Sequence, residues 1–125
     1  MNVVDSSAWL SWFAGDGNAT LFAEAIEDTA KLLVPTVAIT EVFRHVMRHR
    51  DEESALLAVA QMHQGHVIAL DAGLAADAAS YGIQYRLPLA DSIIYATARR
   101  HHATVWTQDS DFKDLPDVRF YARRP

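Results

Sequence analysis

Four acidic residues stand where four segments of the chain end or begin, and their type and position could support chemistry. They are Asp5, Glu41, Asp91 and Asp109. Asp5 and Asp109 each follow a short strand-like run, whereas Glu41 and Asp91 lie near the starts of helix-like stretches. In open α/β sheets, ligands bind beyond the carboxyl ends of the strands, which is where the fold delivers such residues. We therefore expect the four carboxylates to meet in one site.

A cluster of four carboxylates needs a cation. Two carboxylates about 4 Å apart repel by roughly 4 kcal/mol at an effective dielectric constant of about 20, so the four cannot all stay ionised without positive charge between them. The expected metal ligands Asp5, Asp91 and Asp109 are hard oxygen donors, which suit Mg²⁺ or Mn²⁺. The chain has no cysteine, and its histidines show no spacing typical of a zinc site.

Each acid also has a simpler structural explanation. Glu41 could pair with Arg44 or His45 on a solvated helix face, where such pairs contribute little. Asp91 could stabilise a helix start through the helix dipole, and Asp109 could belong to a polar turn. For Asp91 the apolar sequence around it favours a shared site, because a lone buried acid would be costly.

Hydroxyl groups and a further acid lie beside these residues. Ser7 is expected to hold Asp5 by a hydrogen bond, whereas Ser6 is expected to cap the helix that follows. The hydroxyl of Thr107 is expected to orient the acid two residues later. Asp111 is a further candidate for the carboxylate set.

The helix around Glu41 has two different faces. One face is apolar and should pack, through Val42, Phe43, Val46 and Met47. On the other face, Arg44 and Arg48 share the side of Glu41 at helical spacing. If Glu41 belongs to a metal site, these two guanidinium groups are candidates for contacts with RNA phosphates.

The elements that would position these residues alternate between strand and helix. Strands are predicted at 2–4, 32–34, 67–70, 103–107 and 118–121, and helices at 6–14, 18–30, 36–50, 52–64, 72–82 and 88–102. This alternation predicts an α/β fold, a three-layer α/β/α sandwich with a central, mainly parallel sheet. The apolar strand at 67–70 is expected to be buried on both faces, and helix 88–102 to be largely buried.

Composition limits the remaining possibilities. A chain of 125 residues, half of them hydrophobic, suits one domain over residues 1–125. The net charge of −5 argues against wholesale coating of nucleic acid, although arginines and histidines cluster locally. No apolar run could span a bilayer and the chain shows no positively charged leader, so we expect a cytoplasmic protein without membrane contact.

Four short motifs follow one another in a recognisable order. They are Val4–Ser7, Thr40–Val42, Leu89–Ala98 and Thr107–Phe112. Together they resemble PIN-domain nucleases, and in particular the VapC toxins of bacterial and archaeal toxin–antitoxin modules, from residue 2 to about residue 121. The resemblance implies the three-layer fold, a Mg²⁺- or Mn²⁺-dependent endoribonuclease, a homodimer, and a VapB-like antitoxin whose tail occupies the active site.

The resemblance also assigns roles to individual residues. It implies that the catalytic acids are Asp5, Glu41, Asp91 and Asp109, with Ser7 and Thr107 as supporting hydroxyls. Asp111 stands where the family often has a further acid. The stretch from Tyr81 to Arg86 does not align with the family. The net charge of −5 is also more negative than is usual for a protein that binds RNA.

Two other classes compete with a nuclease. A metal-dependent phosphatase or a receiver-like phosphoacceptor also gathers aspartates at strand ends, but a receiver needs a lysine after a late strand. Neither Lys31 nor Lys113 is placed for that role. A catalytically inactive PIN-like module, binding nucleic acid or protein, would be expected if one of the four acids were missing, and all four are present.

Overall fold

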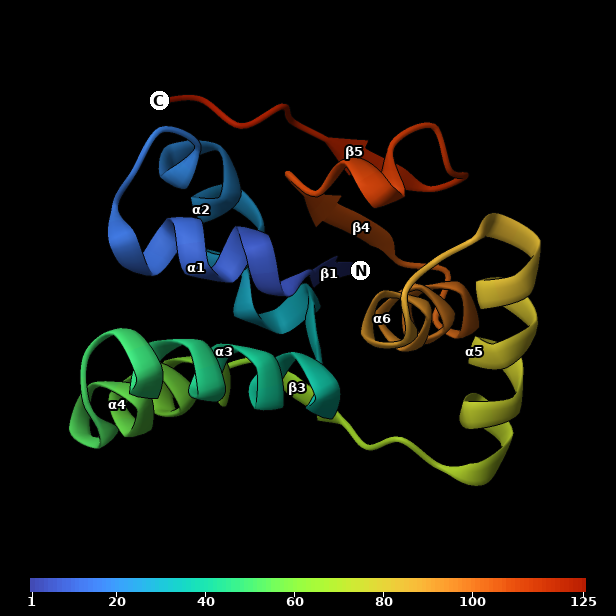
Figure 1. Cartoon of the computed structure of the whole chain (residues 1–125), viewed down its shortest axis with the longest axis horizontal. Coiled ribbons are helices and arrows are strands. Elements are labelled where there is room, and N and C mark those ends of the chain that lie inside the picture. Colours follow the sequence, from blue (N-terminus) through green and yellow to red (C-terminus); the bar gives the residue numbers. More distant parts are fainter.

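A sheet of five strands runs through the centre of the computed structural model, which describes residues 1–125 (Figure 1). The strands are β1 (Asn2–Val4), β2 (Leu32–Pro35), β3 (His66–Ile68), β4 (Thr104–Thr107) and β5 (Val118–Phe120). Their order in the sheet is β3-β2-β1-β4-β5, and every neighbouring pair is parallel. This confirms the predicted α/β class.

Helices connect the strands and cover both faces of the sheet. They are α1 (Ser6–Ala14), α2 (Ala19–Glu27), α3 (Thr36–His49), α4 (Glu52–Met62), α5 (Ala72–Tyr85) and α6 (Leu89–Arg100), with short 3₁₀ turns at Thr29–Lys31 and Ser110–Phe112. Figure 1 shows α5 and α6 on the opposite side of the strands from α1 to α4, which gives the predicted three layers. None of these helices has the length and apolarity that crossing a bilayer requires.

The core lies between the layers and is built from strands and helices together. Val3 and Val4 of β1 and Val34 of β2 are fully buried. On the helical side, Trp9 of α1 and Tyr95 of α6 are the largest fully buried side chains. Because these residues come from both faces, the central strands β1, β2 and β4 are held firmly, and with them the positions of the residues that follow each strand.

Three expectations about burial are wrong in whole or in part. Val67 is 38% exposed because β3 is an edge strand that pairs with β2 alone, so it is not covered on both faces. Leu89 is 78% exposed, because it is the first residue of α6 and lies outside the core. The rest of α6 is largely buried, as predicted. Met47 lies towards the exposed end of α3 and does not pack with Val42 and Val46.

Candidate metal centre

The site forms at the edge of the sheet where β1 and β4 end. Asp5 directly follows β1, and Asp109 lies two residues after β4. The two strands are paired with Val4 opposite Trp106, and the Asp5 amide donates to the Trp106 carbonyl at 3.1 Å. Parallel pairing therefore brings the two acids to the same edge.

Three carboxylates gather most closely at this edge. Asp91, Asp109 and Asp111 each offer one oxygen, and these oxygens all lie within 4.8 Å of one another. Asp91 and Asp109 are half-buried, whereas Asp111 is exposed, so the group is open to solvent on one side. The tightest group thus includes Asp111, which the sequence placed only in a supporting role, and does not include Asp5.

Asp5 is held beneath this group by the start of α1. It is the N-cap of that helix, and its Oδ1 accepts from the Ala8 amide at 3.1 Å. The Ser7 hydroxyl donates to its two oxygens at 2.8 and 3.1 Å. The cap of α1 is therefore Asp5 and not Ser6, because the aspartate already occupies the position that precedes the helix.

Burial strongly affects the protonation of Asp5. The side chain is almost completely enclosed, with 2% of the residue exposed. Desolvation raises the pKa of Asp5 to about 7, while the Ser7 hydroxyl, the Ala8 amide and the Thr107 hydroxyl lower it and the charge of Asp109 raises it further. A nearby cation would be needed to keep Asp5 fully ionised at neutral pH.

Glu41 reaches the site from α3 and is tied to α1. Its Oε1 accepts a hydrogen bond of 2.6 Å from the hydroxyl of Ser6. The ion pairs of the protein lie elsewhere, so Glu41 does not pair with Arg44 or His45. The bond between Ser6 and Glu41 instead joins two helices across the mouth of the site.

Asp91 lies among all the other acids. Its place in the first turn of α6 is the one predicted. Desolvation raises the pKa of Asp91 to about 8, and repulsion adds to this in the order Asp109, Asp5, Glu41 and Asp111. A helix-start acid on an ordinary surface would have no such neighbours, so the dipole alone does not explain this residue.

Short hydrogen bonds shape the loop after β4. The Asp109 amide donates to the hydroxyl of Thr107 at 2.9 Å, and the Asp111 amide donates to Asp109 Oδ1 at 2.9 Å. Thr107 is fully buried and holds the backbone of Asp109, not its carboxylate. The tight turn places Asp109 and Asp111 on one side, and the Asp-Ser-Asp spacing was the sequence signal for this pair.

The donor set fits a hard divalent cation. The three oxygens that gather are carboxylates, and no lysine or arginine neutralises them, since the three ion pairs involve only Arg99 and Arg100 at the far end of α6. Burial raises the pKa values of Asp5 and Asp91, and repulsion by neighbouring carboxylates raises them further. These features match the preferences of Mg²⁺ or Mn²⁺.

Two surface features adjoin the acids. A polar pocket on α3 is lined by Glu41, Arg44, His45, Arg48 and His49. Both arginines are exposed, on the side of the helix that carries Glu41.

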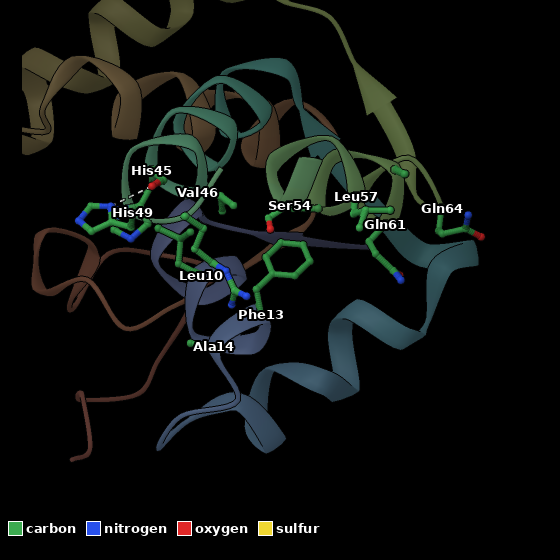
Figure 2. A pocket seen from close by; sticks show the side chains of 13 residues that line it. Leu10, Phe13, Ala14, His45, Val46, His49, Ser54, Leu57, Gln61 and Gln64 are labelled. Carbon is green, nitrogen blue, oxygen red and sulfur yellow. Dashed lines mark hydrogen bonds between the residues drawn. The ribbon is translucent and has the colours of Figure 1, made fainter. Parts of the chain in front are cut away.

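The second feature is an apolar groove between α1 and the α3–α4 pair. Figure 2 shows Leu10 and Phe13 of α1 on one side of it, with Val46 and Leu57 on the other. The stacked rings of His45 and His49, with centroids 4.1 Å apart, line both the groove and the polar pocket. The groove therefore leads towards Glu41.

Comparison with known proteins shows the family to which the chain belongs. A family model described as the PIN domain matches residues 3–118. The chain belongs to the PIN-domain family. No curated protein sequence matches it.

Solved structures extend the likeness over nearly the whole PIN-domain chain. A toxin–antitoxin complex from Klebsiella pneumoniae superposes with a TM-score of 0.81 at 22% identity, covering 98% of this chain and 100% of that one. VapC20 of Mycobacterium tuberculosis, a sarcin-ricin loop cleaving toxin, gives 0.78 at 17% identity, covering 94% and 97%. DNA-bound VapBC from Salmonella typhimurium gives 0.73 at 13% identity, covering 97% and 96%. At these identities the likeness shows a shared fold.

Proposed function

We propose that this PIN-domain protein is a Mg²⁺- or Mn²⁺-dependent endoribonuclease and the toxin of a toxin–antitoxin module, acting in the cytoplasm. The observation that carries the proposal is the group formed by Asp91, Asp109 and Asp111, whose oxygens lie within 4.8 Å of one another without a protein cation. The similar solved structures support it, since they include toxin–antitoxin complexes and a toxin that cleaves the sarcin-ricin loop. Family membership supports a hydrolase that acts on nucleic acid.

In this proposal Asp91 and Asp109 would hold the metal, and Asp111, the buried Asp5 and Glu41 would add negative charge around it. A bound Mg²⁺ supplies Lewis acidity at a phosphate oxygen and lowers the pKa of a coordinated water. The protein places these carboxylates and offers no nucleophile of its own. Attack by water on the phosphorus, with departure of the 3′ oxygen, would leave a 3′ hydroxyl on one product and a 5′ phosphate on the other.

Arg44 and Arg48 are the proposed contacts to RNA phosphates. Both are exposed on α3 and line the same pocket as Glu41. A phosphate backbone that passes along this pocket would reach the carboxylate group while its charge is balanced by the two guanidinium groups. Such contacts hold RNA without reading its sequence.

The antitoxin is the proposed occupant of the apolar groove. A partner segment with apolar side chains would pack against Leu10, Phe13 and Leu57, which line the groove. The residues that follow would pass His45 and His49, and a lysine or arginine there would reach the carboxylates in place of the metal. A homodimer of the single 1–125 domain completes the proposal, on the resemblance to VapC toxins.

Cleavage of RNA by the purified protein tests the function. We expect hydrolysis in Mg²⁺ or Mn²⁺, no hydrolysis in EDTA, and products with 5′ phosphate ends. Co-expression with a VapB-like antitoxin should give a complex that no longer cleaves. Cleavage that persists in EDTA, or products that end in a 2′,3′-cyclic phosphate, would contradict hydrolysis by a metal-activated water.

A further inference from the structure

A chain of hydrogen bonds runs from the C-terminal segment to Asp5. Arg124 Nε donates to Asn18 Oδ1 at 2.7 Å, and Asn18 Nδ2 donates to Gln108 Oε1 at 3.1 Å. Gln108 donates twice to Ser7 at 3.4 Å, from Nε2 to the carbonyl and from its backbone amide to the hydroxyl. That hydroxyl in turn donates to Asp5. The chain joins residues far apart in sequence, and no sequence motif indicates it.

The side chain of Asn18 is not used to cap a helix. Asn18 precedes α2, a position that favours asparagine because its side chain accepts from the first turn. It makes no such bond here, and the residue is 1% exposed. Its amide group is instead directed at Gln108 and at the Ala122 carbonyl, 2.9 Å away.

The partners of Asn18 fix which way its amide points. The carbonyl of Ala122 only accepts and Nε of Arg124 only donates, so Nδ2 must face the first and Oδ1 the second. Asn18 therefore presents an N–H group to Gln108. This turns the Gln108 oxygen towards Asn18 and its amide nitrogen towards Ser7.

This direction matters at the metal centre. The Nε2 amide donates to the Ser7 carbonyl, and the backbone amide of Gln108 donates to the Ser7 hydroxyl, whose single proton remains for Asp5. Gln108 lies between Thr107 and Asp109, so its bonds to Ser7 tie the segment after β4 to the first turn of α1, which follows Asp5. They thereby set the spacing between Asp5 and Asp109.

The C-terminal segment packs closely against the turn that carries Asn18. Arg124 Nη2 donates to the Gly17 carbonyl at 2.7 Å. A Cβ at Gly17 would lie 2.5 Å from the Arg124 carbonyl oxygen, so this approach requires glycine. The segment is thus a firm anchor for the amide of Asn18.

We propose that Asn18 and Gln108 are positioning residues of the metal centre: acting through Ser7, they fix the Asp5 carboxylate relative to Asp109. The inference rests on the proposed metal-dependent hydrolysis. Neither residue is expected to touch RNA, because both are buried, with Asn18 at 1% and Gln108 at 7% exposure.

The variants Asn18→Leu and Gln108→Met test this. Each removes a directed side-chain amide, because Leu keeps the branching of Asn and Met the unbranched shape of Gln without polar groups. Gln108→Met leaves the contacts between Asn18 and Arg124 in place, and it keeps the backbone bond to the Ser7 hydroxyl while removing the side-chain bond to the Ser7 carbonyl. The control is Asp16→Asn, in the same turn, where Asp16 accepts from Ser11 at 2.5 Å with no link to Asp5. We would measure Mn²⁺ binding by calorimetry, and kcat and KM on a model RNA.

Both variants should lose about tenfold in Mn²⁺ affinity and in kcat, which is the usual effect of removing a hydrogen bond that orients a metal ligand. KM for RNA should not change. The Asp16→Asn control should match the wild type. If Asn18→Leu does not fold, Gln108→Met decides alone. Variants that melt lower but bind Mn²⁺ and turn over like the wild type would show that the network only fastens the C-terminal segment. A wild-type protein that neither binds Mn²⁺ nor cleaves RNA would overturn the proposed function instead.

Discussion

At the scale of single residues, Asp91 combines three features that separate it from an ordinary helix-start acid. It is half-buried, it faces the four other acids of the site, and no hydrogen bond of the site reaches its carboxylate, since these go to Asp5, Glu41 and Asp109. Burial and repulsion by the other acids together raise its pKa. A carboxylate in this position gains from a bound cation more than from any group the protein supplies.

Replacing the acids should remove activity without unfolding the protein. We expect Asp91→Asn and Asp5→Asn each to abolish Mg²⁺-dependent RNA cleavage and to relieve growth arrest on expression, because each removes a charge that the metal needs. Circular dichroism would check the fold. Cleavage retained by both variants would show that the site lies elsewhere.

The same substitution should have opposite effects on stability with and without metal. In EDTA, Asp91→Asn removes repulsion among the acids, so its melting temperature should equal or exceed that of the wild type, although most buried substitutions destabilise. Mn²⁺ at about 100 times its dissociation constant should stabilise the wild type by roughly 2.7 kcal/mol and the variant by much less.

Thermal melts of both proteins in EDTA and in Mn²⁺ decide this. Asp77→Asn is the control, because Asp77 is an exposed acid outside the site, near Arg100 at 3.7 Å. If Asp91→Asn melts well below the wild type in EDTA, or both gain equally from Mn²⁺, Asp91 is a helix-start residue and not a ligand.

At the scale of elements, the sequence predicts the type and position of each helix and strand better than the contacts between them. Local hydrophobic periodicity and turn residues suffice to place β1 and α1, which the structure has at Asn2–Val4 and Ser6–Ala14. The hydrogen bond from Ser6 to Glu41 could not be predicted, because it depends on how α1 and α3 lie across the sheet. The exposure of β3 depends on strand order, which the apolar pattern of 67–70 does not contain.

The exposed face of α3 carries the prediction at this scale. In an Asp91→Asn background that does not cleave, replacing Arg44 and Arg48 by Gln should weaken RNA binding for all sequences. The slope of log affinity against log salt should become shallower by roughly 1.4, because two phosphate contacts on a single strand are lost.

The matched control is Lys31→Gln with Arg123→Gln. Both residues are exposed and neither lines the α3 pocket, and the pair removes the same charge. If the control changes the salt slope as much as the α3 pair, the effect comes from net charge and this face does not contact RNA.

At the scale of the whole molecule, the net charge of −5 hides an uneven distribution. Five of the acids stand at one edge of the sheet, where a metal would cancel part of their charge, and the arginines of α3 lie beside them. The motif order in the sequence was enough to predict that edge. It could not show that Asp111, and not Asp5, belongs to the tightest group of carboxylates. That outcome depends on the position of Asp5 as the N-cap of α1, which only the fold determines.

The acids also set how the stability of the whole protein depends on pH. Burial raises the pKa of Asp5 to about 7 and that of Asp91 to about 8 in the folded protein, so both hold protons that the unfolded chain has already released. Where the folded state binds more protons, the free energy of unfolding falls as pH rises. The metal-free protein should therefore lose stability from about pH 4 to about pH 8 through these two groups.

His45 acts in the opposite direction. Burial and the nearby His49 lower the pKa of His45, so its contribution to stability grows as the pH rises towards and past the pKa of histidine in the unfolded chain.

Comparing the wild type with Asp91→Asn removes the contribution of His45, because both proteins keep the histidines. In EDTA, the melting temperature of the wild type should fall more between pH 5.5 and pH 8 than that of the variant. Saturating Mg²⁺ should remove the difference, because metal replaces the protons. Equal falls in EDTA would mean that Asp91 titrates as an ordinary surface acid and that the acids at this edge do not act as one cluster.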